Sequence, residues 1–310
     1  VESAILAAVA GDIVEIPQGT CSWTSTLVVS PPAITIRGVG IDVTVIVDNV
    51  PKTGGGVDAR MLVLATPAGG SFRITNLTFR GGTTTGSESE CCEGLLWVGG
   101  TSNSFRMDHV KFDNPNQTAM VITGALHGVI DHNTFDMTST EGQALFVRHD
   151  AWPSGANVWG DGSFSNTVVL GTSAALFFEN NSFVGGNTKQ VIDGDGGCRV
   201  VFRYNTSESS VGNHGTETGG RHRGCRSFEI YNNTFTKAGY DPVTGAGAFN
   251  EGVMIRSGTG VIHNNTWTGF KNAIVMATYR HPTLPGGPQT SAVWGICDGS
   301  NAWDGNVGPE

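Results

Sequence analysis

Charged side chains recur at related places in a chain that is otherwise poor in charge. Charged residues make up 15% of the 310 residues. Even so, Arg148, Asp193, Arg221 and Arg256 fall at one position when short segments of the chain are aligned with one another. An arginine can neutralise a bound carboxylate, and an aspartate can move a proton to or from a reacting group. Their recurrence predicts acid–base chemistry on an anionic ligand.

The alignment uses segments that each contain one apolar residue expected to face inward. In chain order they are Leu96-Trp-Val98, Val121-Ile-Thr123, Phe146-Val-Arg148, Val191-Ile-Asp193, Gly219-Gly-Arg221 and Met254-Ile-Arg256. The residues expected in the core are Val98, Ile122, Val147, Ile192 and Ile255. Because side chains alternate across a strand, the residue after each of these faces outward. Arg148, Asp193 and Arg221 are thereby expected in line on three successive turns.

A second outward column lies two residues further along the same segments. It contains Asp150, Asp195 and Arg223, with His149 and His222 between the two columns. A like-charged run such as Arg221-His-Arg223 gains little from a structural role. We therefore interpret the patch as a functional surface. The alternative is an exposed ladder of ion pairs, each contributing about 0.5 kcal/mol.

A short phrase repeated along the chain indicates which elements position this patch. A polar pair followed by a hydroxyl and an aromatic residue, or a near variant, begins at Asn76, His109, His132, Asn180, Tyr204, Asn232 and Asn264. The shortest spacings indicate a unit of roughly 23 residues, which is typical of a solenoid with insertions. Asn133, Asn181, Asn205, Asn233 and Asn265 are expected to form an amide ladder beside a stack of aromatic rings. We expect His109, His132 and His263 to be structural or exposed.

Composition excludes several classes of partner. The net charge of −9 and the pI near 5.3 argue against generic nucleic-acid binding, which normally needs a basic surface. The longest apolar stretch, from Ala4 to Ala10, is too short to cross a bilayer, which takes about 20 residues. We therefore expect no nucleic acid and no membrane among the partners.

The six cysteines show no metal-binding spacing and favour disulfides in an exported protein. Cys198 and Cys225 lie on successive turns, where strands about 5 Å apart bring their Cα atoms within disulfide reach. We predict that these two are bonded. The chain begins at Val1 without Met or a basic leader, so a signal peptide is not expected in it, and we expect the protein to be secreted.

The opening of the chain resembles a known family. The residues that carry the resemblance are Gly11-Asp-Ile-Val-Glu-Ile-Pro17 with Gly19-Thr, Ile34-Thr-Ile-Arg-Gly38 and the later Asn-Asn-Thr-Phe phrases. Over about residues 11–277 the chain resembles the pectate-lyase-like superfamily. The resemblance implies an all-β fold, a single-stranded right-handed parallel β-helix, with polysaccharide lyases, glycoside hydrolases and tailspikes as relatives.

We expect one domain over residues 1–310. Residues 1–10 are expected to form a capping helix, 11–277 the coils, and 278–310 an irregular C-terminal segment. Insertions are expected at about 151–170, 211–220 and 237–251, and long loops on a rigid scaffold often carry function. These loops supply Trp152, Trp159, His214 and Tyr240 as candidate substrate-binding residues, together with His149, Asp150, Asp195 and Arg256 from the patch.

Two mechanisms remain open for an acidic polysaccharide substrate. In a lyase, Arg221, His222, Arg223, Arg148 and Asp193 would neutralise a uronate carboxylate and move protons during β-elimination. Arg221-His-Arg-Gly224 is similar to the Arg-His-Gly motif of the alginate and chondroitin lyase branch, with one extra residue. The branch's Asn-Gly-x-Glu and Lys-Ser-Ser motifs are not cleanly present.

In a glycoside hydrolase, Asp193 and Asp195 would act as acid and base. A third alternative is a carbohydrate-binding adhesin, tailspike or filament subunit that performs no cleavage. Asp150, Asp193 and Asp195 could also hold Ca²⁺, which many lyases of the family use. The sequence does not decide the polysaccharide, the pairing of the other cysteines or the oligomeric state.

Overall fold

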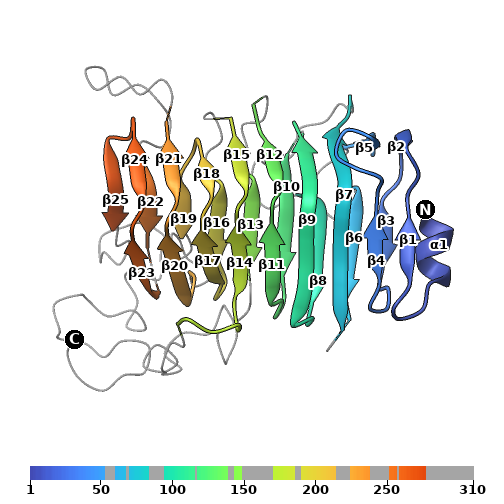
Figure 1. The fold of residues 1–310 in the computed structure, drawn as a ribbon, viewed down its shortest axis with the longest axis horizontal. Coiled ribbons are helices and arrows are strands. Elements are labelled where there is room, and N and C mark those ends of the chain that lie inside the picture. The colour runs from blue at the N-terminus through green and yellow to red at the C-terminus, as the bar shows by residue number, and fades with distance from the viewer. Residues whose placement is uncertain are drawn as a thin grey trace.

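The described part of the chain is a long coil of short parallel strands with a helix at its N-terminal end (Figure 1). The computed structural model describes residues 1–52, 60–67, 70–83, 94–115, 117–138, 143–148, 170–185, 190–213, 224–237, 251–256 and 258–276. Every strand pair between the named strands is parallel, which confirms the predicted right-handed parallel β-helix. Helix α1 (Glu2–Ala7) buries Ile5 and contacts β3 at the N-terminal end of the coil.

Two sheets run the length of the coil. The described strands of the larger sheet are β1 (Ile13–Glu15), β2 (Gly19–Trp23), β4 (Thr35–Arg37), β5 (Thr44–Asp48), β7 (Ser71–Gly81), β9 (Ser104–Asp113), β11 (Gly128–Asp131), β12 (Thr134–Asp136), β14 (Leu176–Glu179), β15 (Ser182–Val184), β17 (Arg199–Arg203), β18 (Thr206–Ser207), β20 (Ser227–Tyr231), β21 (Thr234–Thr236), β23 (Thr259–His263) and β24 (Thr266–Thr268). Those of the smaller sheet are β3 (Leu27–Val29), β6 (Leu62–Thr66), β8 (Gly94–Gly100), β10 (Thr118–Thr123), β13 (Leu145–Arg148), β16 (Ile192–Asp195), β19 (Val211–Asn213), β22 (Glu251–Ile255) and β25 (Asn272–Met276).

The repeated phrase marks a sharp bend in the larger sheet. Its first residue is in the left-handed conformation in all seven occurrences, with φ between 53° and 59°. Asn and His tolerate this conformation better than most residues, which explains their frequency at the first position. We call this position the bend position; its occupants are Asn76, His109, His132, Asn180, Tyr204, Asn232 and Asn264.

The predicted asparagine ladder is present directly after the bend. The backbone N–H and Nδ2 of Asn133 both donate to Asn181 Oδ1 at 3.0 Å. The same pair of bonds joins Asn181 to Asn205, Asn205 to Asn233 and Asn233 to Asn265, at 2.9–3.1 Å. Each buried amide therefore satisfies the backbone of the turn before it, and this holds the coils in register.

The aromatic stack beside the ladder is also present, with one substitution. Phe112, Phe135 and Phe183 stack with ring centroids 4.9 and 4.7 Å apart. The next phrase ends in Ser207, which leaves a gap in the column. Phe202 fills this gap, with its centroid 5.6 Å from Phe183 and 6.0 Å from that of Phe235. The column then ends on Trp267, stacked on Phe235 at 5.9 Å.

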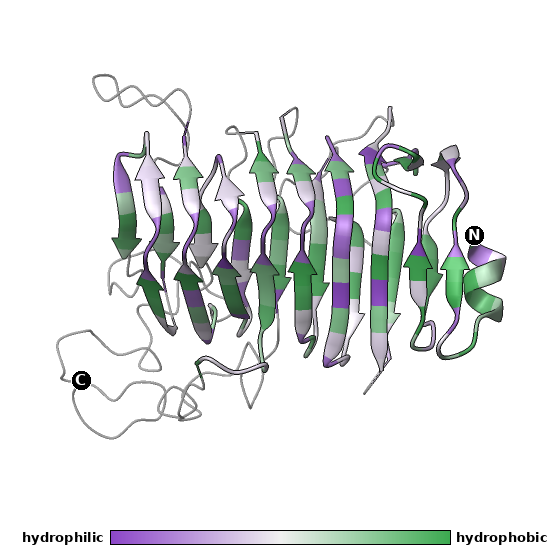
Figure 2. Cartoon of the chain, in the orientation of Figure 1, coloured by the Kyte–Doolittle hydropathy of each residue, from purple (hydrophilic) through white to green (hydrophobic). Residues whose placement is uncertain are grey.

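The core predictions for the smaller sheet are confirmed. Val98, Ile122, Val147, Ile192 and Ile255 are all buried. Figure 2 shows the apolar strands and the hydrophilic bends that alternate along the coil. The helix in the described part of the chain is too short to cross a membrane.

Candidate functional site

The outward face of β13 and β16 brings together three of the predicted site residues. Phe146 is the partner of Asp193 in register, and Arg148 is the partner of Asp195. The sequence alignment had placed Arg148 opposite Asp193, so that prediction is wrong by two residues. The same register shift places Asp195, which was predicted two residues further along, directly opposite Arg148.

A disulfide explains the slip. Val147 pairs with Gly194, and an added Cβ at Gly194 would lie 2.7 Å from Cys198 Sγ and 2.5 Å from Cys225 Sγ. The buried sulfur atoms fill the core position that Val147 fills in the preceding turn. A shift of two residues keeps the inward and outward faces unchanged. Asp193 and Asp195 thus still face outward.

The turn assigned to Gly219-Gly-Arg221 is also wrong. The strand that pairs with β16 is β19, and Gly212 is the partner of Asp193. Residues 211–213 therefore belong to the coil, whereas the sequence had placed them in an insertion. Residues 211–213 and 219–221 both contain glycine, and either could supply this strand. The prediction took 219–221 because it contains a charged residue. Arg221 itself lies outside the described residues.

Arg148 is held against Asp195 on this face. Its Nε donates to Asp195 Oδ1 at 3.1 Å, and its guanidinium carbon lies 5.4 Å from the centre of the Phe146 ring. Gly196, with φ of 61°, leaves room for the arginine, since a Cβ there would lie 2.3 Å from Arg148 Cγ. The arginine side chain is 28% exposed and the aspartate side chain 10%. The cation is therefore the more accessible partner.

Asp193 is held by a residue that the sequence reading missed. Gln143 Nε2 donates to Asp193 Oδ2 at 2.9 Å, and both residues are buried. Gln143 and Gln190 each stand two residues before a strand, in Gln-Ala-Leu145 and Gln-Val-Ile192, and both are buried. This recurrence of glutamine at the same place in successive turns is the signal that could have found them.

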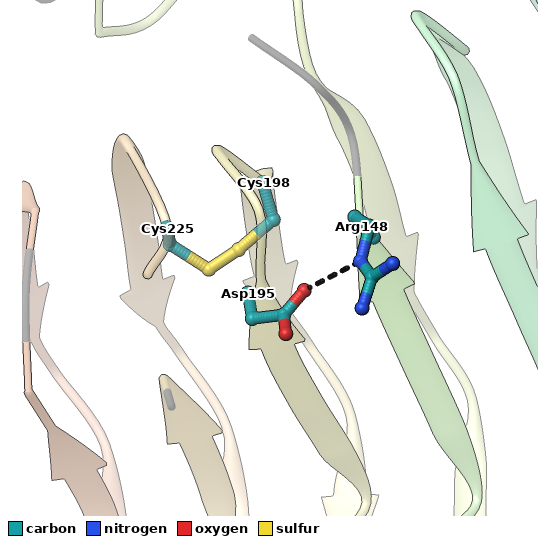
Figure 3. The surroundings of a disulfide bond; sticks show 4 residues. All are labelled: Arg148, Asp195, Cys198 and Cys225. Atoms are coloured by element: carbon teal, nitrogen blue, oxygen red, sulfur yellow. Dashed lines mark hydrogen bonds and ion pairs between the residues drawn. A yellow bond between two sulfur atoms is a disulfide. The ribbon is translucent and has the colours of Figure 1, made fainter. Parts of the chain in front are cut away.

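The predicted disulfide between Cys198 and Cys225 is confirmed, and it closes the site on one side (Figure 3). The two Cα atoms are 4.2 Å apart. Gly224 forms a bridge with Asp195, and its carbonyl accepts from the backbone N–H of Gly197 at 2.9 Å. The chain therefore returns to Asp195 directly after Arg223. Cys21, on β2, is exposed and carries a free thiol.

A cluster of basic residues adjoins the disulfide. Arg199 and Arg226 directly follow the two bonded cysteines, and the repeated Cys-Arg pair is the sequence signal for this cluster. Burial and the charge of Arg226 lower the pKa of Arg199. Burial and the charge of Arg199 lower the pKa of His127. Arg199 thus lies close enough to Arg226 and to His127 for their positive charges to disfavour one another.

Most of the predicted loop residues are not placed. His149, Asp150, Trp152, Trp159, His214, Arg221, His222, Arg223 and Tyr240 lie outside the described residues. Arg256 is described; it is half-buried directly after β22. The structure therefore brings Arg148, Asp193 and Asp195 together, and the other assignments stay predictions.

The described carboxylates do not by themselves form a calcium site. Asp193 and Asp195 each accept a hydrogen bond from a protein side chain. Two carboxylates supply too few of the 6–8 oxygen ligands that Ca²⁺ takes. Within the described ranges, no group of three or more His, Cys, Asp or Glu residues could hold a metal ion. The third predicted ligand, Asp150, is not among them, so calcium binding stays a prediction.

Comparison with known proteins shows the fold. No protein-family model matches the sequence, and no curated protein matches it. Among solved structures, the chain is similar to an alginate lyase from Paenibacillus sp. str. FPU-7, with 16% identity, a TM-score of 0.50 and coverage of 89% of this chain and 95% of that one. It also matches Geobacillus virus E2 ORF18, with 11% identity, a TM-score of 0.38 and coverage of 86% and 53%. A third match is the catalytic domain of a GH87 α-1,3-glucanase in complex with nigerose, with 14% identity, a TM-score of 0.33 and coverage of 88% and 62%. At 16% identity, the likeness to the alginate lyase structure confirms the fold alone, the parallel β-helix that the resemblance implied.

Proposed function

We propose that the protein is a secreted carbohydrate-active enzyme that cleaves an acidic, uronate-containing polysaccharide by β-elimination. The observation that carries the proposal is the outward column of Arg148 and Asp195, with Asp193 beside it, on one face of the smaller sheet. A partly exposed guanidinium held by a buried carboxylate is a fixed point for an anionic sugar. The disulfide supports an exported protein.

In the proposed reaction, Arg148 binds the uronate carboxylate and stabilises the negative charge that develops on it. A base removes the ring proton next to that carboxylate, and the electron pair forms a ring double bond. The glycosidic bond on the neighbouring carbon breaks, and an acid protonates the departing oxygen. His222 is proposed as the base, flanked by Arg221 and Arg223. Their chain runs into Gly224, the partner of Asp195.

The fold supports this class of activity without deciding it. The solved structure with the highest TM-score reported above is that of an alginate lyase, and it covers nearly the same length of chain. Function resides in sites that are carried on folds, so the proposal depends on the side chains described above. The loop residues Trp152, Trp159, His214 and Tyr240 are proposed to contact the sugar chain, with His149, Asp150 and Arg256.

A glycoside hydrolase is the second candidate, because two buried aspartates face the same way. Asp193 and Asp195 are separated by one residue of a strand, so their Cα atoms lie about 6.6 Å apart. An inverting glycosidase needs two separated carboxyl groups with room for a water molecule between them, and two side chains that leave one strand on the same face can supply such a pair. In that reaction one aspartate would protonate the leaving oxygen and the other would activate water.

One assay separates these functions. The protein is incubated with alginate, polygalacturonate and a neutral glucan, and both the ultraviolet absorbance of unsaturated sugar and the release of reducing ends are followed. We expect absorbance with an acidic polymer. Reducing ends without absorbance would replace the lyase with the hydrolase, and neither signal would leave a binding protein.

Matched variants then test the site. Arg148→Ala and Asp195→Asn should lose activity while the fold is retained. Arg80→Ala is the control, because Arg80 also bonds an aspartate of a neighbouring strand, Asp113, but lies on the larger sheet. Full activity in Arg148→Ala, or an equal loss in Arg80→Ala, would refute the assignment.

A further inference from the structure

Three bend positions hold an aromatic ring in place of asparagine. Four of the seven are Asn, which suits the left-handed conformation. The others are His109, His132 and Tyr204, with φ of 53°, 54° and 57°. Tyrosine is rare in this region of backbone space, and residues held there often belong to functional surfaces. Tyr204 therefore calls for a reason beyond the turn itself, and the two histidine rings occupy the same position on earlier turns.

Core packing does not supply that reason. The side chains of His109 and His132 are 54% and 53% exposed, and Tyr204 is 51% exposed. All three lie at the bend of the larger sheet, whereas Arg148 is on β13 of the smaller sheet (Figure 1). Figure 2 shows the hydrophilic bands that cross β7 and β9 and mark the bends of the following turns.

Two buried carboxylates hold the histidine rings in place. His109 Nδ1 lies 2.9 Å from Asp108 Oδ2, and His132 Nδ1 lies 2.8 Å from Asp131 Oδ2. The two rings stack in parallel with centroids 5.4 Å apart. A carboxylate only accepts, so each Nδ1 is the donor of its hydrogen bond. The outward edges of the rings are thus oriented before any ligand arrives.

The same carboxylates orient two arginines. Arg73 Nη2 lies 2.6 Å from Asp108 Oδ2, and Arg106 Nη2 lies 3.0 Å from Asp131 Oδ2. The arginine side chains are 41% and 49% exposed, whereas the aspartates beneath them are buried. The guanidinium groups therefore present hydrogen-bond donors at the surface, while the carboxylates that fix them lie below.

Aromatic rings continue the surface towards the C-terminal turns. Arg203 Nε donates to Glu179 Oε2 at 2.6 Å, and its Nη1 donates to Tyr231 Oη at 2.9 Å. Tyr231 stacks on His263 with centroids 4.8 Å apart, and its ring meets Tyr204 edge-on at 6.3 Å. We call the whole surface the bend stripe: Arg73, Arg106, His109, His132, Arg203, Tyr204, Tyr231 and His263.

A shared metal ion does not fit the two histidines. Zinc lies about 2.0–2.1 Å from a histidine nitrogen, so two ligands of one ion are at most about 4.2 Å apart. Parallel rings with centroids 5.4 Å apart, each tied to its own aspartate, do not meet this limit. The arginines beside them also disfavour a cation.

We propose that the bend stripe is a non-catalytic binding surface for one strand of an acidic polysaccharide lying along the coil. Guanidinium groups would donate to its carboxylates, the outward imidazole Nε2 atoms would accept from its hydroxyls, and tyrosine faces would contact the apolar faces of its sugar rings. Neighbouring turns are about 4.8 Å apart, comparable with one sugar of an extended chain. The choice of an acidic polysaccharide as the ligand rests on the proposed function. The geometry of the bend stripe does not depend on that function.

The test uses a variant that keeps the bend. His109→Asn, His132→Asn and Tyr204→Asn together give the stripe the residue that Asn180 and Asn232 place at the same position, and the buried aspartates keep their arginines. Binding is measured by retardation in native gels that contain alginate, polygalacturonate or neutral dextran. All comparisons are made in the Arg148→Ala background, so that cleavage does not shorten the polymer.

We expect retardation by the acidic polymers and not by dextran, and an apparent Kd at least fivefold higher for the triple variant. Arg80→Ala in the same background controls for the loss of one surface charge and should bind like its parent. In the otherwise wild-type enzyme, the triple substitution should lower turnover of the polymer and leave turnover of short oligosaccharides unchanged. Equal retardation of the triple variant and its parent, or none of the parent by either acidic polymer, would overturn the proposal. Absence of cleavage would count only against the proposed function.

Discussion

Arg148 and Asp195 are direct partners on neighbouring strands, and Arg148 Nε lies 3.1 Å from Asp195 Oδ1. Removing the arginine leaves a nearly buried carboxylate without this donor, which costs about 1–3 kcal/mol. We therefore expect Arg148→Ala to lower the free energy of unfolding by that amount and polyuronate cleavage by at least a hundredfold. Urea unfolding and the absorbance assay measure the two effects.

The double variant Arg148→Ala/Asp195→Asn separates the two roles of the pair. It should recover part of the stability, because the carboxylate charge that Arg148 balances is also removed, but it should recover no activity. A double variant that is less stable than Arg148→Ala would show that Asp195 does not depend on this arginine. Arg148→Lys should keep the charge and lose much of the activity, because lysine lacks the planar fork.

The disulfide is expected to stabilise the turn beneath the site. It joins residues that are 27 apart in sequence, and closing a loop of this length stabilises by roughly 3–4 kcal/mol in the chain-entropy account. Cys198→Ala/Cys225→Ala should lower the free energy of unfolding by a comparable amount. Thermal unfolding with and without a reductant measures this. A reductant should shift the wild type and leave the double variant unchanged; an equal shift in both would contradict the account.

The asparagine ladder should lose more stability at its centre than at its end. Asn205 Oδ1 accepts from the backbone N–H and Nδ2 of Asn181, and Asn205 Nδ2 donates to Asn233 Oδ1 and Phe178 O. Asn205→Ala leaves several buried groups unsatisfied, and we expect a loss of about 2–4 kcal/mol. Asn265 is half-buried in the last described turn, so Asn265→Ala should cost less. Equal losses in urea unfolding would show that the ladder does not act cooperatively.

The fold was predictable because its signals are local and repeated. The bend position selects Asn or His through its left-handed backbone, and Asn205 and its equivalents must bond the turn before them. A sequence shows such requirements directly. Alternation along β13 and β22 also gave the correct buried residues, Val147 and Ile255.

The register at the site was not predictable by the same reasoning. Alternation fixes which face of the sheet a residue occupies but not which residue of the neighbouring strand lies opposite it. The sequence pattern therefore does not reveal a register shift of two residues. At Gly194 the buried volume comes from Cys198 and Cys225, which reach the site from outside β16. The bond from Gln143 to Asp193 is another case, because the two residues are 50 apart in sequence. Contacts of this kind follow from the fold.

Asp108 should make the stability of the coil depend on pH in the acid range. Although burial raises its pKa, hydrogen bonds from Arg73, His109 and Thr75 outweigh this and lower the pKa from 3.8 to about 2. A carboxylate with a lowered pKa stabilises the folded state above the unfolded value, near 4, and this contribution is lost as pH falls towards 2. Allowing for screening of the exposed arginines, we expect on the order of 1–2 kcal/mol.

Urea unfolding of the wild type and Asp108→Asn at several pH values between 2 and 5 measures this contribution. The wild type should lose stability faster than the variant as pH falls below 4, and the two curves should converge near pH 2. Parallel curves would contradict the lowered pKa.

Gly196 offers the most selective test of the geometry at the site. Its φ of 61° is unfavourable for other residues, and a Cβ there would lie 2.3 Å from Arg148 Cγ. Gly196→Ala should therefore displace the arginine from Asp195 without removing either charge, and lower cleavage of an acidic polymer at least tenfold. The matched control is Gly171→Ala, which has a similar φ of 70° and open space around its Cβ. Both variants should lose about 1–2 kcal/mol of stability to backbone strain, but only Gly196→Ala should lose activity. Equal activity in the two variants would show that the position of Arg148 does not control the reaction.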